Sequence, residues 1–169
     1  MAKLKSDRGY RYIKELGGAV RRSTISFAAG WLVDHGYVRG RVLDYGCGFG
    51  LDAAHFGWEA YDPYYRQDAV QGPFDTVICN HVLNMLTRQS REQAIRNIHG
   101  LLCDQGSAYL IVSRNIPATG KVAIRKRIQN YVVLTLPSVY VDAKLEIYCL
   151  DKESEFTDAT SEIECRLAR

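Results

Sequence analysis

Residues 41–50 read RVLDYGCGFG, a short apolar run that leads directly into a glycine-rich loop. The run is rich in strand-forming residues and predicts a buried strand over residues 41–45. The three alternating glycines that follow let the backbone turn sharply and let a ligand approach where a Cβ atom would collide. A strand that ends in such a loop is typical of α/β proteins that bind a ligand at the carboxyl end of the sheet.

Asp44 lies two residues before the first glycine of this loop and helps to separate two kinds of cofactor. A dinucleotide site has the spacing G-x-G-x-x-G, and its backbone amides face a pyrophosphate. Here the spacing is G-x-G-x-G, and a carboxylate suits a cationic ligand better than a pyrophosphate. S-adenosylmethionine (SAM) carries an ammonium and a sulfonium and no phosphate. The loop therefore favours SAM, and a nicotinamide dinucleotide stays the weaker alternative.

Strands alternate with helices along the rest of the chain. The predicted helices cover residues 23–36, 51–56 and 90–102, and the predicted strands cover residues 58–62, 74–80 and 107–113. A further helix is predicted over residues 121–130, and one or two strands around Pro137. This order indicates an α/β fold with a Rossmann-like, doubly wound, mostly parallel sheet. Only eleven residues lie between Asp62 and Phe74, so the sheet should be abbreviated between the usual second and fourth strands.

The second predicted strand ends in YDPYY, residues 61–65. An acid at this point commonly accepts hydrogen bonds from a ribose diol, which would place Asp62 on the ribose and Pro63 and Tyr64 near the adenine. One alternative is the D-P-P-Y tetrad with which amino-methyltransferases hold a target base, but that tetrad should follow the later strand over residues 74–80. Another alternative is a proline turn with surface tyrosines.

The later strand is followed by Asn80, His81 and Asn84, where a methyl group would be presented. His81 has several possible roles: a cofactor contact, a general base, a group that orients a nucleophile, or a structural residue. We expect the nucleophile to be held near His81, Asn84 and Arg114. A conspicuous catalytic residue is not required, because positioning alone supplies much of the rate of such a transfer.

The charge distribution and the composition indicate which partners and which cellular location to expect. Lys and Arg exceed Asp and Glu by six over residues 1–41 and by five over residues 114–128, whereas residues 42–113 and 129–169 each carry a net charge of −4. If the two basic segments converge, they would attract an anionic partner such as nucleic acid.

The five scattered cysteines indicate neither disulfides nor a metal site. No apolar run approaches the roughly 20 residues of a membrane helix and the start lacks a signal peptide, so we expect a cytoplasmic protein that binds no membrane.

Four stretches together resemble the class I SAM-dependent methyltransferases, and more closely those associated with DNA phosphorothioation systems and their stand-alone phage and prophage relatives. These stretches are AVRRSTIS, VLDYGCGFG, YDPYY and FDTVICNHVLNML, within residues 19–113. The resemblance implies that Asp44, Gly46 and Gly48 line the methionine end of SAM, that Asp62 binds the ribose, and that residues 80–83 lie near the adenosine and the methyl group.

The expected organisation is a basic segment over residues 1–20, a SAM-binding methyltransferase domain over residues 21–150 and an acidic tail over residues 151–169. The expected cofactor-binding residues are Arg22, Asp44, Tyr45, Gly46, Cys47, Gly48, Asp62, Pro63, Asn80, His81 and Leu83. The leading hypothesis is a SAM-dependent methyltransferase with an unidentified acceptor, for which nucleic acid is one candidate. The alternative is a non-catalytic Rossmann-like module that binds nucleic acid or a partner protein.

Overall fold

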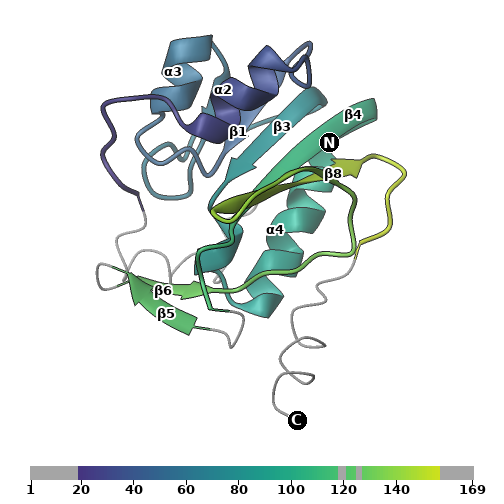
Figure 1. The fold of residues 1–169 in the computed structure, drawn as a ribbon. Helices are drawn as coiled ribbons and strands as arrows, with labels where there is room; N and C mark the ends of the chain where they lie inside the picture. Colours follow the sequence, from purple (N-terminus) through teal and green to yellow (C-terminus); the bar gives the residue numbers. More distant parts are fainter. Residues whose placement is uncertain (1–18, 118–120, 125–126, 157–169) are drawn as a thin grey trace.

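A computed structural model describes residues 19–117, 121–124 and 127–156 of the chain (Figure 1). Most of residues 1–20 and of residues 151–169, for which we expect a basic segment and an acidic tail, lies outside these ranges. No helix in the described ranges is both long enough and apolar enough to cross a membrane.

A six-stranded sheet forms the centre of the molecule. Its strands are β1 (Val42–Tyr45), β2 (Glu59–Tyr61), β3 (Phe74–Asn80), β4 (Leu102–Ser113), β7 (Ser138–Val141) and β8 (Leu145–Asp151). Their order across the sheet is β2-β1-β3-β4-β8-β7. The first four are parallel, and β8 is antiparallel to both β4 and β7. The predicted mostly parallel, Rossmann-like sheet is therefore confirmed.

Strand β2 forms one edge of this sheet, and residues 63–73 contain no further strand. They hold only a turn, closed by an isolated bridge between Asp62 and Arg66. The predicted abbreviation of the sheet is confirmed, because the chain passes directly from this turn to β3. The cavity described below is therefore not flanked by a further strand on the β2 side.

Helices cover both faces of the sheet, with α2 (Phe27–Asp34) and α3 (Leu51–Phe56) on one face and α4 (Arg88–Leu101) on the other (Figure 1). Alternate residues of each strand point to opposite faces. One buried cluster joins α4 to the strands through residues such as Ile95, Ile98, Leu43, Val77 and Leu110. A second joins α2 to the other face through Ala28, Leu32, Val42, Ile78 and Ile111. The sheet core thus holds the carboxyl ends of β1, β2 and β3 in fixed register.

Helix α2 begins at Phe27, four residues later than the sequence predicts. Ser26 caps it, because its side-chain oxygen accepts a hydrogen bond from the backbone N–H of Ala29 at 3.1 Å. The backbone N–H of Ser26 donates instead to Asp52 at 2.8 Å. Residues 23–26 are therefore left free of the helix and reach toward the ligand end of the sheet.

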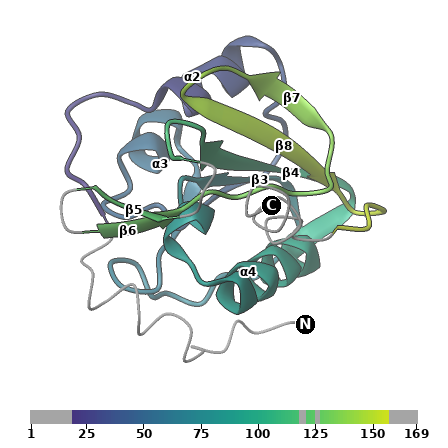
Figure 2. The same cartoon turned by 60° about the horizontal axis from the view of Figure 1, so that its bottom comes forward.

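Residues 121–130 are not a helix, contrary to the prediction. They form strands β5 (Lys121–Ile124) and β6 (Arg127–Asn130), an antiparallel pair apart from the main sheet (Figures 1 and 2). The sequence KVAI alternates polar or small residues with β-branched ones, and this period of two suits a strand. Strand β6 lies against the short 3₁₀ helix η2 (Leu83–Met85). The strands predicted around Pro137 are confirmed as β7 and β8.

Candidate functional site

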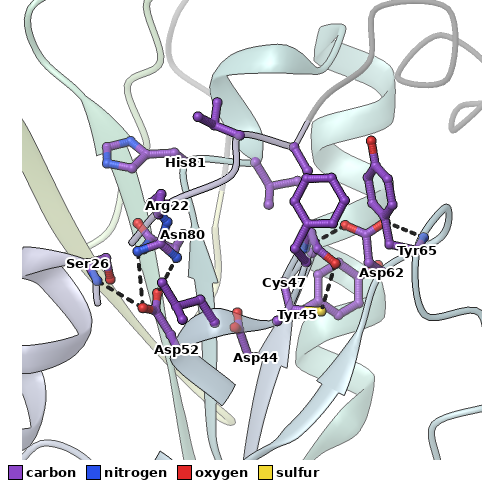
Figure 3. Close-up of a pocket in the computed structure, with 18 of the residues that line it drawn as sticks. Arg22, Ser26, Asp44, Tyr45, Cys47, Asp52, Asp62, Tyr65, Asn80 and His81 are labelled. Atoms are coloured by element: carbon purple, nitrogen blue, oxygen red, sulfur yellow. Dashed lines mark hydrogen bonds and ion pairs between the residues drawn. The ribbon is translucent and has the colours of Figure 1, made fainter. Parts of the chain in front are cut away.

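A cavity of about 690 Å³ opens at the carboxyl ends of β1, β2 and β3. Ten of the eleven residues predicted to bind the cofactor line it: Arg22, Asp44, Tyr45, Gly46, Cys47, Gly48, Asp62, Pro63, Asn80 and His81. Figure 3 labels seven of them, all but Gly46, Gly48 and Pro63. Leu83, the eleventh, does not line the cavity and is fully buried in the core beneath α4. The expectation that Leu83 faces the ligand is therefore corrected, whereas the other ten converge on one space.

The glycine loop forms one wall of this cavity. Gly46 and Gly48 have φ angles of 77° and 58°, in the left-handed region that favours glycine. The backbone N–H groups of Gly46 and Cys47 both donate to the carbonyl oxygen of Tyr61, at 2.7 and 3.1 Å. A Cβ atom on Gly48 would lie 2.8 Å from the Cβ atom of Ala19, so the N-terminal segment packs directly against the loop.

The Asp62 carboxylate connects the YDPYY turn to the glycine loop. One oxygen accepts the backbone N–H of Gly48 at 2.9 Å, and the other accepts those of Tyr64 and Tyr65 at 2.8 and 3.1 Å. Pro63 and Tyr65 line the cavity, whereas Tyr64 packs against the core. The turn thus lies on the glycine-loop side of the cavity, next to β2, and not at the end of β3.

Arg22 and Asp52 form an ion pair across the opposite wall. Both guanidinium nitrogens of Arg22 donate to the Asp52 carboxylate, at 3.1 and 2.8 Å, and Ser26 donates a backbone N–H to it (Figure 3). Burial alone would raise the pKa of Asp52, but the hydrogen bonds from Arg22 and Ser26 outweigh burial, and the pKa is lowered. Asp52 therefore stays ionised and fixes the Arg22 head group at the cavity.

Asp44 lies at the bottom of the cavity with almost no exposed surface. Burial, reinforced by repulsion from the Asp52 carboxylate, raises the pKa of Asp44 to about 7, although Arg22 opposes the shift. The side-chain oxygen of Asn80 is also buried and has no hydrogen-bond partner in the described part of the chain. These two acceptors fit a ligand that carries a cationic or hydrogen-bond-donating group.

His81 follows β3 with a φ angle of 57°, which is uncommon for a residue with a side chain. Its backbone N–H donates to the carbonyl of Ile111 at 3.0 Å, and its Nδ1 atom lies 3.0 Å from the Ser113 hydroxyl. Partial desolvation of the ring and the nearby Arg22 charge lower the pKa of His81. The imidazole is therefore mostly neutral at pH 7 and able to accept a proton at the cavity.

Cys47 faces the same cavity as a thiol. Burial, with smaller contributions from the charges of Asp44 and Asp62, raises its pKa to about 12. A protonated thiol is a poor nucleophile. Cys47 is thus suited to packing in the loop rather than to covalent chemistry.

Asn84 and Arg114, expected beside the nucleophile, do not line the cavity. The Asn84 amide donates to the carbonyl of Asn130 at 2.8 Å and accepts the backbone N–H of Ser113 at 2.8 Å. The Arg114 guanidinium is paired with Glu146 and donates to the carbonyl of Val132 at 2.7 Å. Both side chains anchor the chain that leaves β6, so their predicted place at the acceptor is corrected.

Several residues that line the cavity were not predicted from the sequence: Ala19, Val20, Arg21, Thr24, Ile25, Ser26, Phe49, Gly50, Leu51, Asp52, Ala54, Tyr65, Met85 and Gln129. The place of Asp52, two residues after the last glycine of the loop, is a visible signal for this residue, because the loop leads into α3 at the cavity. Gln129 carries no such signal, because the sequence predicts a helix where strand β6 lies.

The sequence matches no protein-family model, and it matches no curated protein. Solved structures do match. One is the 1,6-didemethyltoxoflavin-N1-methyltransferase of Burkholderia thailandensis, crystallised with 1,6-didemethyltoxoflavin and S-adenosylhomocysteine (TM-score 0.51, 16% identity, 72% of this chain and 75% of that chain). Another is the DhpI complex with S-adenosylhomocysteine (TM-score 0.53, 12% identity, 87% and 89%). A third is the PH0226 protein of Pyrococcus horikoshii OT3 (TM-score 0.51, 12% identity, 86% and 92%). At these identities the likeness concerns the fold alone, and the chain shares the Rossmann-like α/β fold of these structures.

Proposed function

We propose that this protein is a SAM-dependent methyltransferase whose cofactor binds in the cavity at the ends of β1, β2 and β3. The observation that carries the proposal is the buried Asp44 carboxyl beneath the glycine loop, whose pKa of about 7 reflects a negative charge that lacks compensation. A cationic ligand would compensate that charge, and a pyrophosphate would oppose it. Two proteins with this fold were crystallised with S-adenosylhomocysteine, which agrees with this choice.

The cavity offers each part of SAM a suitable group. Arg22, Asp44 and Asn80 would hold the amino-acid end, because a guanidinium suits a carboxylate and the two acceptors suit an ammonium. Asp62 would hold the ribose. Its two oxygens already accept backbone N–H groups, but a carboxylate oxygen accepts more than one hydrogen bond. Pro63 supplies an apolar surface for the adenine beside it.

Bound SAM would supply a methyl group on a positively charged sulfur, ready for attack by a nucleophile. The protein would then have to hold the acceptor in line and exclude competing water. His81 would accept a proton from the acceptor, and two observations support this role: its imidazole is mostly neutral, and its Nδ1 atom lies 3.0 Å from the Ser113 hydroxyl. This role requires no covalent intermediate on the protein.

We propose nucleic acid, or another anionic molecule, as the acceptor. Arg21, which is exposed, lies beside the cavity, and Gln129 of the β5–β6 pair lines it. The sequence around this pair contains Lys121, Arg125, Lys126 and Arg127. The N-terminal basic segment thus lines the cavity through Arg21 and Arg22, and the second basic segment directly precedes Gln129 in the sequence, which supports an anionic acceptor. Phosphate contacts would make acceptor binding strongly dependent on salt concentration.

A non-catalytic module that binds nucleic acid or a partner protein is the second candidate. The observation that favours it is the short segment after β2, which leaves that side of the cavity without a flanking strand. Such a module would keep the fold and bind no cofactor. The two candidates therefore differ in one measurable property, the affinity for SAM and S-adenosylhomocysteine.

Titration calorimetry with SAM and S-adenosylhomocysteine tests the proposal. We expect binding at micromolar concentrations to the wild type, loss of binding in Asp44→Ala, and unchanged binding in Asp68→Ala, an exposed acid that does not line the cavity. NAD and NADP should leave the melting temperature unchanged. Radiolabelled methyl transfer to DNA, RNA and metabolite pools would follow. Absence of binding to the wild type would reject the methyltransferase and favour the non-catalytic module.

A further inference from the structure

Two exposed aromatic rings stand together at the mouth of the cavity. Phe49 belongs to the glycine loop and is 37% exposed, and Tyr65 belongs to the YDPYY turn and is 42% exposed. Their ring centroids are 4.7 Å apart and their planes are inclined by 47°. The residues at the bottom of the cavity, Asp44 and Asp62, are by contrast almost completely buried. The aromatic pair, Phe49 and Tyr65, therefore forms part of the rim.

Two arginines flank this aromatic pair. The Arg21 guanidinium carbon lies 4.4 Å from the centroid of the Phe49 ring. Arg66 donates to the Phe49 carbonyl at 3.5 Å and lies over Gly50. Both arginines are exposed, and neither is ion-paired with an acid in the described part of the chain. Their positive charges are therefore available to an anion that reaches the rim.

Strand β6 also reaches the cavity, through Gln129, and the sequence just before this residue carries Lys121 and Arg127. A small aromatic metabolite would meet the aromatic pair but brings no row of phosphates to Arg21 and Arg66. A nucleic acid strand carries both aromatic bases and regularly spaced phosphates. In a duplex the base faces are stacked within the helix, so only an unpaired base can lie on an aromatic ring.

We infer that the aromatic pair and its two arginines form a stacking site for an unpaired base of a single-stranded nucleic acid acceptor. The base would stack on Phe49 or Tyr65, and the adjoining phosphates would lie near Arg21 and Arg66. A neighbouring nucleotide would then reach the cavity. The role of this site in holding a methyl acceptor rests on the proposed methyltransferase function. Binding of the strand itself is measurable without methyl transfer.

Fluorescence anisotropy with labelled oligonucleotides of about 12 nucleotides tests the site, with the protein saturated with S-adenosylhomocysteine. The probes are oligo-dT, oligo-rU and a DNA duplex of the same length. We expect each single strand to bind at least about fivefold more tightly than the duplex, and Phe49→Ala/Tyr65→Ala to weaken single-strand binding at least about fivefold. The single strand that binds more tightly, oligo-dT or oligo-rU, would indicate whether the acceptor is DNA or RNA.

Three variants provide controls. Phe49→Tyr/Tyr65→Phe keeps both rings and should bind like the wild type, which separates stacking from a folding defect. Phe27→Ala removes another exposed ring, 56% exposed on α2 and outside the cavity, and should have no effect. Arg21→Gln/Arg66→Gln should reduce the slope of log affinity for the single strand against log salt concentration. The reduction should correspond to the loss of about two phosphate contacts.

The same variants are titrated with S-adenosylhomocysteine. If Phe49→Ala/Tyr65→Ala loses S-adenosylhomocysteine and keeps oligonucleotide binding, the aromatic pair belongs to the cofactor site and the inference is overturned. Equal binding of duplex and single strand, unaffected by the alanine substitutions, would also overturn it. Failure of the wild type to bind S-adenosylhomocysteine would reject the proposed function instead. Single-strand binding, repeated without that ligand, would still decide the stacking site.

Discussion

The Asp62 carboxylate accepts a hydrogen bond from the backbone N–H of Gly48 at 2.9 Å, and so joins the turn after β2 to the loop after β1. The two strands are parallel neighbours, with Tyr45 opposite Tyr61, and both therefore end at the same edge of the sheet. Because the bond connects two loops, it limits their independent movement. A ligand that binds between such loops loses less free energy in ordering them.

We expect Asp62→Ala to destabilise the protein and to disturb the glycine loop. The substitution leaves three backbone N–H groups, those of Gly48, Tyr64 and Tyr65, without their acceptor. Urea denaturation should show a loss of about 1–3 kcal/mol in the free energy of unfolding. Asp62→Asn keeps one acceptor oxygen and should lose less. A fully stable Asp62→Ala variant would show that the carboxylate does not hold the loop.

A matched pair of glycine substitutions should separate backbone strain from close packing. Gly48 and Gly57 have φ angles of 58° and 73°, so alanine is strained at both, by about 1–2 kcal/mol. A Cβ atom at position 57 meets nothing within 4 Å, whereas at position 48 it would lie 2.8 Å from the Ala19 Cβ atom. Gly48→Ala should therefore lose more stability in urea than Gly57→Ala. Equal losses would mean that the segment at Ala19 moves aside without cost.

Asp44 should make the stability of the ligand-free protein fall as the pH rises. The pKa of its carboxyl is raised from 3.8 to about 7, so the folded state holds a proton that the unfolded state releases in this range. The contribution of this bound proton to the free energy of unfolding is complete below pH 4 and is lost as the pH rises through about 7. Asp44→Asn should remove this dependence, and at pH 8 it should be more stable than the wild type, by on the order of 1–4 kcal/mol. Urea titrations at several pH values measure it.

The same carboxyl should couple ligand binding to protons. A cation beside Asp44 favours the ionised form, so binding of SAM should release a proton and should strengthen as the pH rises from about 6 to about 7.5. Calorimetry in buffers with different ionisation enthalpies would report the proton. His81 faces the cavity as well, and its protonation at lower pH would repel a cationic ligand. This repulsion would also weaken binding as the pH falls. A His81→Gln variant that keeps the proton release would assign the release to Asp44.

The sequence predicted those parts of the site that follow from local order along the chain. A strand, an acid and alternating glycines are contiguous in residues 41–50, and Asp62 directly follows β2. The ion pair between Arg22 and Asp52 joins residues thirty positions apart and depends on how the N-terminal segment folds back over the loop. No local pattern records such a contact.

Asn84 and Arg114 show a second limit. Polar residues after two neighbouring strands are good candidates for a site at the carboxyl edge of a sheet. Asn84, however, contacts Asn130, the last residue of the segment predicted as a helix, and Arg114 contacts Val132 just after that segment. Backbone carbonyls 46 and 18 positions away along the chain accept these hydrogen bonds, and no local sequence pattern predicts such partners.

Arg114 should therefore matter for stability and not for cofactor binding. Its guanidinium is nearly buried, pairs with Glu146, donates to the Tyr148 hydroxyl at 2.6 Å and lies 4.9 Å from the centroid of the Tyr131 ring. Arg114→Ala leaves the Glu146 carboxylate without its partner and should reduce the free energy of unfolding by about 3–5 kcal/mol. Arg114→Met/Glu146→Leu replaces both charges with apolar groups and should recover part of that loss.

Urea denaturation measures these losses, and Arg88→Ala, which breaks the exposed pair with Glu92, is the control that should cost about 0–1 kcal/mol. Titration of the folded Arg114→Met/Glu146→Leu protein with S-adenosylhomocysteine should give the wild-type affinity, because Arg114 does not line the cavity. A stable variant that no longer binds this ligand would instead place Arg114 in the binding site. Single-strand binding should weaken only to the extent that the segment after β6 moves, because the guanidinium contacts this segment at Tyr131 and Val132.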